Sequence, residues 1–523
     1  MKVFNRLESR CMIGFLFLFM LSIEYVIADE LLFAPLINDG VVLQRDMPVN
    51  IWGSAVPGEK LEILLNGKKQ SETITDNGGK WLVVMQPHSA GGPYILKART
   101  LRDSITVKDV YFGEVWLAAG QSNMVQNLNN TEGGKERLAT TVEELRFVIV
   151  PQKTGLPVES ELTSEELSWK TFTPRANNQI AAVAFFFAEY MLPYIGCKIG
   201  IIQSSYGATP AQAWTPLHAL DACPELKYYG DFVREGLLGE RTKKDFLFEI
   251  EEYNRWNTDM RKWRESKEGA QPKNPGPISE SNLYSRKTPV VLYENMIKPL
   301  IPFTARGVIW YQGEGNAGKP DEYRILFPAM INAWREAWNR PDWPFFFVQL
   351  SAFSHPVNDW PALRAVQAYV RDTLPFTGMA ITIDKGEKDN IHPRYKQPVG
   401  ERLARLALAH VYGKEIVSRG PVYNCIDNIE GEVIVNFNYT GRGLQSTSGE
   451  LFIPGFELAA SDSIFYPAKA EISSLNTIKI SSEKVDVPAF VRYGWHNWIE
   501  PPLTLINSEG LPAEPFLFSF LNL

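Results

Sequence analysis

The sequence predicts an α/β protein, with a mostly parallel sheet in a central domain and a β domain on either side of it. Between residues 109 and 415, strand-like apolar runs alternate with amphipathic helical patterns, as in parallel sheets that carry helices on both faces. Outside this region, short alternating runs separated by turn residues indicate β structure. A chain of 523 residues is also too long for a single core.

The central alternation gives the expected elements in order. Apolar runs predict strands at 114–119, 198–203, 306–312, 344–350 and 378–384. Apolar residues spaced three and four apart predict helices at 178–193, 321–338, 361–374 and 396–411. A charged helical insertion at 216–288 interrupts the pattern.

Turn sequences indicate where the flanking domains lie. Pairs such as Asn66-Gly67 separate short runs near the N-terminus, so residues 29–108 are expected to form a β-sandwich. The β pattern returns after Arg419-Gly420-Pro421. We therefore expect the central domain to cover 109–415 and a C-terminal β domain to cover 416–523.

Composition and charge exclude some kinds of partner. The chain is 45% hydrophobic, as in globular proteins. Its net charge of -7 and its lack of a basic tract argue against nucleic acid as a partner. Cys197, Cys223 and Cys425 are widely separated, so they predict no disulfide framework and lack the spacing of zinc ligands. We expect no metal and no cofactor.

The first residues have the pattern of a secretory signal peptide covering 1–28. Lys2 and Arg6 supply positive charge, an apolar run follows at 12–21, and Ala28 is suited to cleavage. Because the run is short for a bilayer crossing, cleavage is favoured over an uncleaved membrane anchor. The protein is then expected to be secreted or periplasmic (lysosomal or extracellular in a eukaryote), without stable membrane insertion.

Ser122 is the first candidate catalytic residue. It lies in Gly120-Gln121-Ser122-Asn123-Met124, directly after the predicted strand 114–119. A buried strand that ends at a glycine and is followed by a serine is how α/β hydrolytic folds present a nucleophile. The alternative is an ordinary turn serine or helix cap.

His392 is the candidate base. It is the only one of the six histidines with an aspartate three positions earlier, Asp389, and that spacing allows both side chains to lie on one side of a turn. It follows the predicted strand 378–384, which places it at the same sheet edge as Ser122. The three residues together suggest a serine hydrolase, whereas a surface histidine that caps a helix is the alternative.

Two further strand ends offer donors for an oxyanion. Gly207 follows the predicted strand 198–203, and its N–H can face a developing negative charge. Gln312 or Asn316, after the strand at 306–312, can complete the oxyanion hole. For each glycine, a simple turn requirement is the alternative.

These motifs resemble those of the sialate O-acetylesterases, within the SGNH (GDSL-like) hydrolase superfamily. The resemblance rests on Gly-Gln-Ser-Asn-Met at 120–124, Trp-Tyr-Gln-Gly-Glu at 310–314 and Ile-His-Pro-Arg at 391–394, and similar stretches at 346–350, 491–495 and 507–512 extend it over nearly the whole mature chain. It implies an SGNH-hydrolase-like three-layer α/β/α domain. Gly315 departs from the usual serine, and Glu294 from a small residue or asparagine, which concerns the shape of the pocket.

The resemblance also implies a secreted carbohydrate esterase that removes O-acetyl groups from sugars, above all from O-acetylated sialic acid, through an acetyl-enzyme. The implied roles are Ser122 as nucleophile, His392 as base with Asp389 as its support, the amides of Ser122 and Gly207 with Gln312 or Asn316 as oxyanion hole, and Gln121 and Glu314 as pocket lining. Relatives vary in whether an acidic residue supports the histidine, so Asp389 is the least certain of these.

Three alternatives remain open. An acetyl-xylan or other hemicellulose acetylesterase would cleave the same kind of ester. A non-catalytic glycan-binding protein would also be secreted and rich in aromatic residues. A metal hydrolase could use Asp384, Asp389 and His392, but no second histidine lies at ligand spacing. The sequence gives no prediction of oligomeric state.

Overall fold

The computed structural model describes residues 30–522, apart from 177–178, 239–250, 253–254, 257, 261, 264–265, 267–268, 274–282 and 356–358. The expected signal peptide, 1–28, and much of the expected insertion therefore lie outside the described residues. Among the helices that are described, none combines the length and the apolar character needed to cross a membrane.

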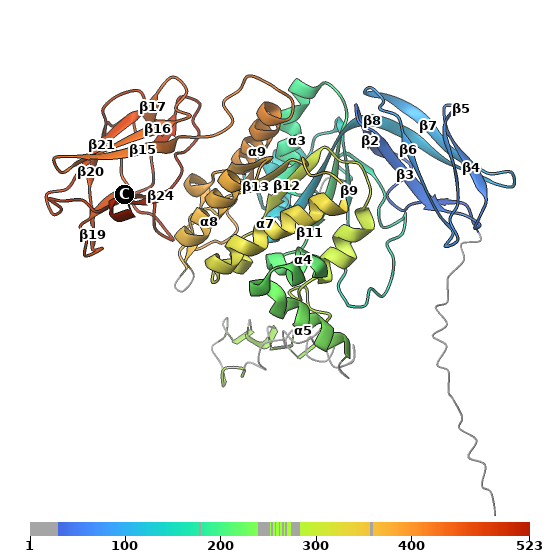
Figure 1. Ribbon diagram of the computed structural model, residues 1–523, viewed down its shortest axis with the longest axis horizontal. Coiled ribbons are helices and arrows are strands. Elements are labelled where there is room, and N and C mark those ends of the chain that lie inside the picture. Colours follow the sequence, from blue (N-terminus) through green and yellow to red (C-terminus); the bar gives the residue numbers. More distant parts are fainter. Residues whose placement is uncertain are drawn as a thin grey trace, which may run out of the picture.

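A largely parallel sheet runs through the middle of the molecule (Figure 1), with strand order β10-β9-β11-β8-β12-β13-β14. Its strands are β8 (Ser104–Gly120), β9 (Val142–Ile149), β10 (Lys170–Phe172), β11 (Ile199–Ser205), β12 (Gly307–Tyr311), β13 (Phe345–Val348) and β14 (Thr377–Ala380). All pairings are parallel except that of β10 with β9 at the edge. The strands predicted from apolar runs are present.

Strands β9 and β10 were not predicted, because charged residues conceal the apolar pattern of β9. Glu143, Glu144 and Arg146 interrupt it. Arg146 is nevertheless buried, since its guanidinium donates to the carbonyl of Gly40 at 2.6 Å and to the carboxylate of Asp109 at 2.7 Å. Tertiary partners thus make a strand of a segment whose composition argues against one.

Helices cover both faces of this sheet (Figure 1). Trp116 and Ala118 of β8 lie in the core that α3 and α9 help to form, whereas Val115 and Leu117 lie in the core shared with α7 and α8. Successive strand side chains point to opposite faces, so one helix pair lies on each. The helices are α3 (Ala182–Ile195), α7 (Pro320–Ala337), α8 (Trp360–Thr373) and α9 (Lys396–His410), close to the predicted ranges.

The N-terminal β region is continuous with the central sheet. Its strands are β1 (Leu32–Phe33), β2 (Val42–Gln44), β3 (Val49–Ser54), β4 (Lys60–Leu65), β5 (Lys68–Ile74), β6 (Lys80–Met85) and β7 (Gly91–Arg99). The first part of β8 pairs antiparallel with β7, and its middle pairs parallel with β2. The expected domain boundary at 108/109 therefore falls inside one strand.

The C-terminal β region lies at the opposite end of the molecule (Figure 1) and has its own apolar core. Its strands are β15 (Val422–Ile429), β16 (Glu432–Asn438), β17 (Leu444–Ser446), β18 (Phe456–Ala459), β19 (Phe465–Pro467), β20 (Lys469–Ile472), β21 (Thr477–Ser481), β22 (Phe490–Tyr493), β23 (Leu505–Asn507) and β24 (Phe516–Ser519). Shorter α-helices among the described residues are α1 (Ser122–Val125), α2 (Gly134–Leu138), α4 (Leu217–Ala222) and α5 (Lys227–Leu238), the last two within the expected insertion.

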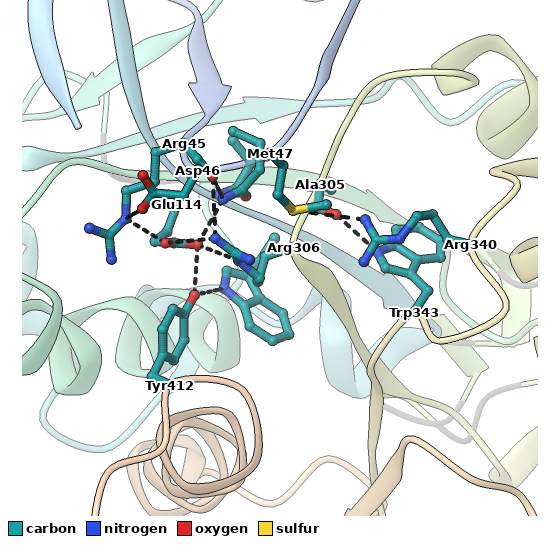
Figure 2. A network of polar contacts seen from close by, with 12 residues as sticks. Arg45, Asp46, Met47, Glu114, Ala305, Arg306, Arg340, Trp343 and Tyr412 are labelled. Carbon is teal, nitrogen blue, oxygen red and sulfur yellow. Dashed lines mark hydrogen bonds and ion pairs between the residues drawn. The ribbon is translucent and has the colours of Figure 1, made fainter. Parts of the chain in front are cut away.

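A buried carboxylate, Glu114 on β8, joins several of these segments (Figure 2). It accepts hydrogen bonds from Arg45 at 2.6 Å and Arg306 at 2.9 Å. Gln44 of β2 donates to it at 3.0 Å, and Tyr412, just after α9, at 2.8 Å. Burial raises the pKa of Glu114, but Arg306 together with Gln44 and Arg45 outweighs burial and holds this pKa below its usual value. The carboxylate is therefore ionised at neutral pH.

We expect Glu114→Gln to lower the free energy of unfolding by about 3 kcal/mol at pH 7, because it leaves two partly buried guanidinium groups without their charge partner. Urea unfolding would measure this. The matched control is Glu432→Gln, whose partner Lys479 is half exposed, and it should cost less than about 1 kcal/mol. A lowered folded pKa means that the contribution of Glu114 is present above its unfolded pKa and lost as pH falls through the folded one. In strong acid, the losses in free energy of unfolding caused by the two variants should therefore become similar. Equal losses at pH 7 would contradict the prediction.

Candidate active site

Ser122 lies where β8 meets its first helix. The strand ends at Gly120, which has a φ of 135° and on which a Cβ would lie 2.3 Å from the carbonyl oxygen of Tyr311, so only glycine fits. The amide of Gln121 then donates to the same carbonyl at 2.9 Å, and α1 begins at Ser122. The serine is thereby fixed at the carboxyl end of a central strand, half-buried.

The structure brings Ser122 and His392 to one cavity. Both residues line a cavity of about 800 Å³, together with Gln121, Glu314 and Asn316. Both also line an adjoining hollow that includes Gly207. Among the described residues, no hydrogen bond joins the Ser122 hydroxyl to the His392 ring. The two side chains thus share a surface open to a ligand.

Strand register places Gly207 beside Ser122. In β11, Ser205 pairs with Gly120 of β8, so the two parallel strands end at the same level. A Cβ built on Gly207 would lie 3.4 Å from the Cβ of Ser122, which puts the Gly207 backbone against the serine. This is the arrangement expected if the Gly207 amide donates a hydrogen bond to the oxyanion that forms when Ser122 attacks a carbonyl group.

The contacts of Gln312 and Asn316 distinguish between the two expected donors. Gln312 is fully buried and does not line the cavity; its amide nitrogen donates to Asn316 at 2.8 Å, and its oxygen accepts from Tyr323 at 3.1 Å. Asn316 does line the cavity, and its amide nitrogen donates to Gln212 at 3.0 Å. Because an amide nitrogen carries two hydrogens, Asn316 retains donor capacity. The geometry favours Asn316, held in place by Gln312.

Asp389 shows no contact with the His392 ring among the described residues. It is exposed, and no ion pair or hydrogen bond between the two occurs in the part of the chain that the structure describes. The histidine backbone is held instead by Asn390, whose oxygen accepts from the His392 amide at 3.0 Å and whose nitrogen donates to the His392 carbonyl at 2.8 Å. The Asn390 amide also donates to Glu387 at 3.1 Å.

The two departures from the family pattern lie in different surroundings. A Cβ on Gly315 would lie 2.8 Å from the carbonyl of Thr209, so the loop packs closely because the side chain is absent. Gly315 lines the cavity and donates its amide to Gln121 at 3.1 Å. Glu294 pairs with Lys298 at 2.6 Å and is not among the lining residues. Only Gly315 therefore affects the shape of the cavity.

A buried polar network that the sequence did not predict lies behind the cavity. Asn123 contacts Glu314 and Lys396, and the ammonium of Lys396 is fully buried. Burial lowers the pKa of Lys396 to about 7 and raises the pKa of Glu314. Burial also lowers the pKa of His392, and the positive charge of Lys396 lowers it further. A lysine at the start of an amphipathic helix gives no sign in the sequence that it is buried.

Asp384, considered above as a metal ligand, is committed elsewhere. Its two carboxylate oxygens accept from Arg402 at 2.6 and 2.8 Å. Within the described ranges, no three His, Cys, Asp or Glu side chains gather in a way that could hold a metal ion.

The outer wall of the cavity comes from the insertion and from loops nearby. Tyr228, Tyr229 and Phe232 of α5 line it, and so do two cationic side chains, Lys287 and Lys319. Lys319 is engaged with the Tyr228 hydroxyl at 3.1 Å. Lys287 is exposed, and no hydrogen bond or ion pair of its ammonium is found among the described residues. The wall thus combines aromatic surface with positive charge.

Comparison with known proteins gives a consistent result. A family model described as carbohydrate esterase, sialic acid-specific acetylesterase, matches residues 276–409. The sialate O-acetylesterase of Rattus norvegicus is 28% identical over 92% of this chain and 93% of its own, and that of Homo sapiens is 28% identical over 93% and 92%. The crystal structure of a carbohydrate acetylesterase from Xanthomonas citri is 31% identical, covers 94% of this chain and 99% of its own, and has a TM-score of 0.77.

We expect the pKa of the His392 imidazole to lie below its ordinary value of 6.5, because burial and the Lys396 ammonium both disfavour the imidazolium ion. An NMR titration of the protein with labelled histidine would measure the midpoint, with His392→Asn used to assign the signal. A midpoint at or above 6.5 would contradict the described surroundings of the ring.

Proposed function

We propose that this chain, which belongs to the sialate O-acetylesterase family of carbohydrate esterases, removes O-acetyl groups from sugars through nucleophilic catalysis by Ser122. The observation that carries the proposal is that Ser122 and His392 line one cavity and that, in the adjoining hollow, the Gly207 backbone lies against Ser122, although the chain separates the three residues widely. Nucleophile, base and backbone donor are the groups that acyl transfer requires.

In the proposed reaction, His392 takes the proton of the Ser122 hydroxyl while the oxygen attacks the acetyl carbonyl carbon. The carbonyl electron pair moves onto oxygen, which the amides of Ser122 and Gly207 and the side chain of Asn316 stabilise. The tetrahedral intermediate collapses, the bond to the sugar oxygen breaks, and His392 returns its proton to that oxygen. Water, deprotonated by His392, then attacks the acetyl carbonyl carbon. The bond to the Ser122 oxygen breaks, acetate leaves, and His392 returns the proton to Ser122. The lowered pKa of His392 favours the neutral imidazole, which is the form that a general base requires.

O-acetylated sialic acid is the proposed substrate, and acetylated xylan is the alternative. The names of the rat and human relatives support the first. So does the cavity wall, because sialic acid carries a carboxylate that can pair with Lys287 or Lys319, whereas the xylose units of xylan are neutral. Aromatic rings such as Tyr228 can pack against the apolar face of a sugar.

We further propose that residues 1–28 are a cleaved signal peptide and that the mature enzyme is secreted. The proposed organisation is a β-sandwich domain at 29–108, an SGNH-hydrolase-like three-layer domain at 109–415 and a C-terminal β domain at 416–523. The separate C-terminal core supports the division near 416, whereas the N-terminal β region shares β8 and one core with the central sheet. N-terminal sequencing of the exported protein would test the cleavage site.

We expect Ser122→Ala to lower kcat for acetate release by at least about 1000-fold, because no other group replaces the nucleophile. Asp389→Asn should stay within about twofold of the natural enzyme, since Asp389 is exposed and no hydrogen bond or ion pair joins it to the ring among the described residues. Hydrolysis of p-nitrophenyl acetate measures both and also tests the non-catalytic alternative. Full activity in Ser122→Ala would refute the mechanism, and a large loss in Asp389→Asn would restore the aspartate as the orienting group.

We expect Lys287→Met to reduce kcat/KM about tenfold for acetylated sialic acid and to leave it unchanged for acetylated xylose oligomers, because only the first substrate offers a carboxylate to the ammonium. The comparison of both substrates with both proteins is the measurement. Lys414→Met, an exposed lysine beyond α9, is the matched control. An equal effect on both substrates would argue against recognition of the carboxylate.

A further inference from the structure

One side chain directly connects the segment of Ser122 to the segment of His392. Asn123, the residue after the serine, donates its amide nitrogen to the carbonyl of Ile391, the residue before the histidine, at 3.0 Å. The same nitrogen donates to Glu314 at 2.5 Å, and its oxygen accepts from the Lys396 ammonium at 2.5 Å. Asn123 and Lys396 are only 1% and 0% exposed. These contacts span α1, the turn after β12, the His392 loop and the start of α9.

The donor and acceptor chemistry allows one arrangement of this network. A lysine ammonium can only donate, so the side chain of Asn123 must present its oxygen to Lys396. Its amide nitrogen, with two hydrogens, is then directed at two acceptors, Glu314 and the carbonyl of Ile391. The two acceptors at the nitrogen end and the Lys396 donor at the oxygen end thus fix the orientation of the amide together.

We propose that Lys396 is a positioning residue, which acts through Asn123 to hold the nucleophile segment and the base segment at a fixed separation. The inference rests on the proposed function, since it concerns the same site. Lys396 does not line the cavity and therefore does not contact the substrate. Its effect on the reaction is transmitted by one amide.

The surroundings of Lys396 argue against a purely structural role. A fully buried ammonium costs stability unless a carboxylate contacts it, and among the described residues Lys396 forms no direct ion pair. The charged groups that face it are Glu314, from the turn after β12, and Glu387, from the loop after β14. Its ammonium also lies 5.3 Å from the ring centre of Tyr311. An apolar side chain of equal length would fill the same space without a buried charge.

The first test is a double-mutant cycle of Lys396→Met and Asn123→Leu, both of similar shape to the natural residues. We expect each single variant to lower kcat on the order of 10- to 100-fold with KM nearly unchanged, because a small misplacement of reacting groups has effects of this size. The double variant should lose little more than either single one, since Lys396 acts through Asn123. Lys414→Met, an exposed lysine just beyond the end of α9, is the control and should retain full activity.

The second readout is the pH profile. The Lys396 charge lowers the pKa of His392 beyond what burial does, so the acidic limb of kcat/KM and the NMR midpoint should both move to higher pH in Lys396→Met. The charge that acts on the ring is that of Lys396 from α9, whereas Glu387 and Arg394, in the same loop as the histidine, pair with each other at 3.1 Å. Lys396→Gln, which also removes the charge, carries the same expectations if the methionine variant does not fold.

The outcomes separate this inference from the function it rests on. If Ser122→Ala retains activity, the proposed mechanism is wrong, and the positioning role of Lys396 is overturned with it. If Ser122→Ala is inactive but Lys396→Met keeps its full kcat and an unmoved pH profile, only the positioning role is overturned. Additive losses in the double variant would overturn transmission through Asn123.

Discussion

The parallel register of β11, β8 and β12 is the constraint on which the site depends. Gly120 pairs with Ser205 on one side and Tyr311 on the other, so three strands end at one level. The loops that follow them are therefore forced together, and each contributes one component of the site. Because Gly120 has no side chain, β8 can turn close against Tyr311 and present Ser122 at that edge. The cavity is thus a property of the sheet rather than of any one loop.

Two buried charged residues, Glu114 on β8 and Lys396 behind the carboxyl end of this strand, differ in whether an opposite charge contacts them. Glu114 is surrounded by two guanidinium groups and neutral donors, and it ties the N-terminal β region and the end of α9 to the sheet. Lys396 lies behind the carboxyl end, and the one direct hydrogen bond of its ammonium among the described residues is to the neutral amide of Asn123. The first arrangement is what stability requires of a buried charge. The second is understandable if the ammonium serves the geometry of the catalytic edge.

The inner and outer parts of the cavity come from different parts of the chain. Residues at the sheet edge include the proposed nucleophile, base and oxyanion donors, whereas α5 and the loop that carries Lys287 supply aromatic and cationic surface. These outer parts belong to the insertion that interrupts the strand–helix alternation. Changes there can alter which acetylated sugar fits without disturbing the register that assembles the reacting groups.

The sequence by itself determined the alternation of elements and the positions of Ser122, Gly207 and His392, because residues at the carboxyl ends of parallel strands must share an edge. Local patterns could not reveal β9, whose charged residues find tertiary partners, or the burial of Lys396, which shows the spacing of an ordinary helical lysine. Nor could spacing settle Asp389, since three residues of separation allow contact with the histidine without requiring it. Only the tertiary structure decided which of Gln312 and Asn316 faces the cavity, and which side chain joins the two catalytic segments. Such contacts connect residues that are distant in the chain, so they depend on the register of the whole sheet.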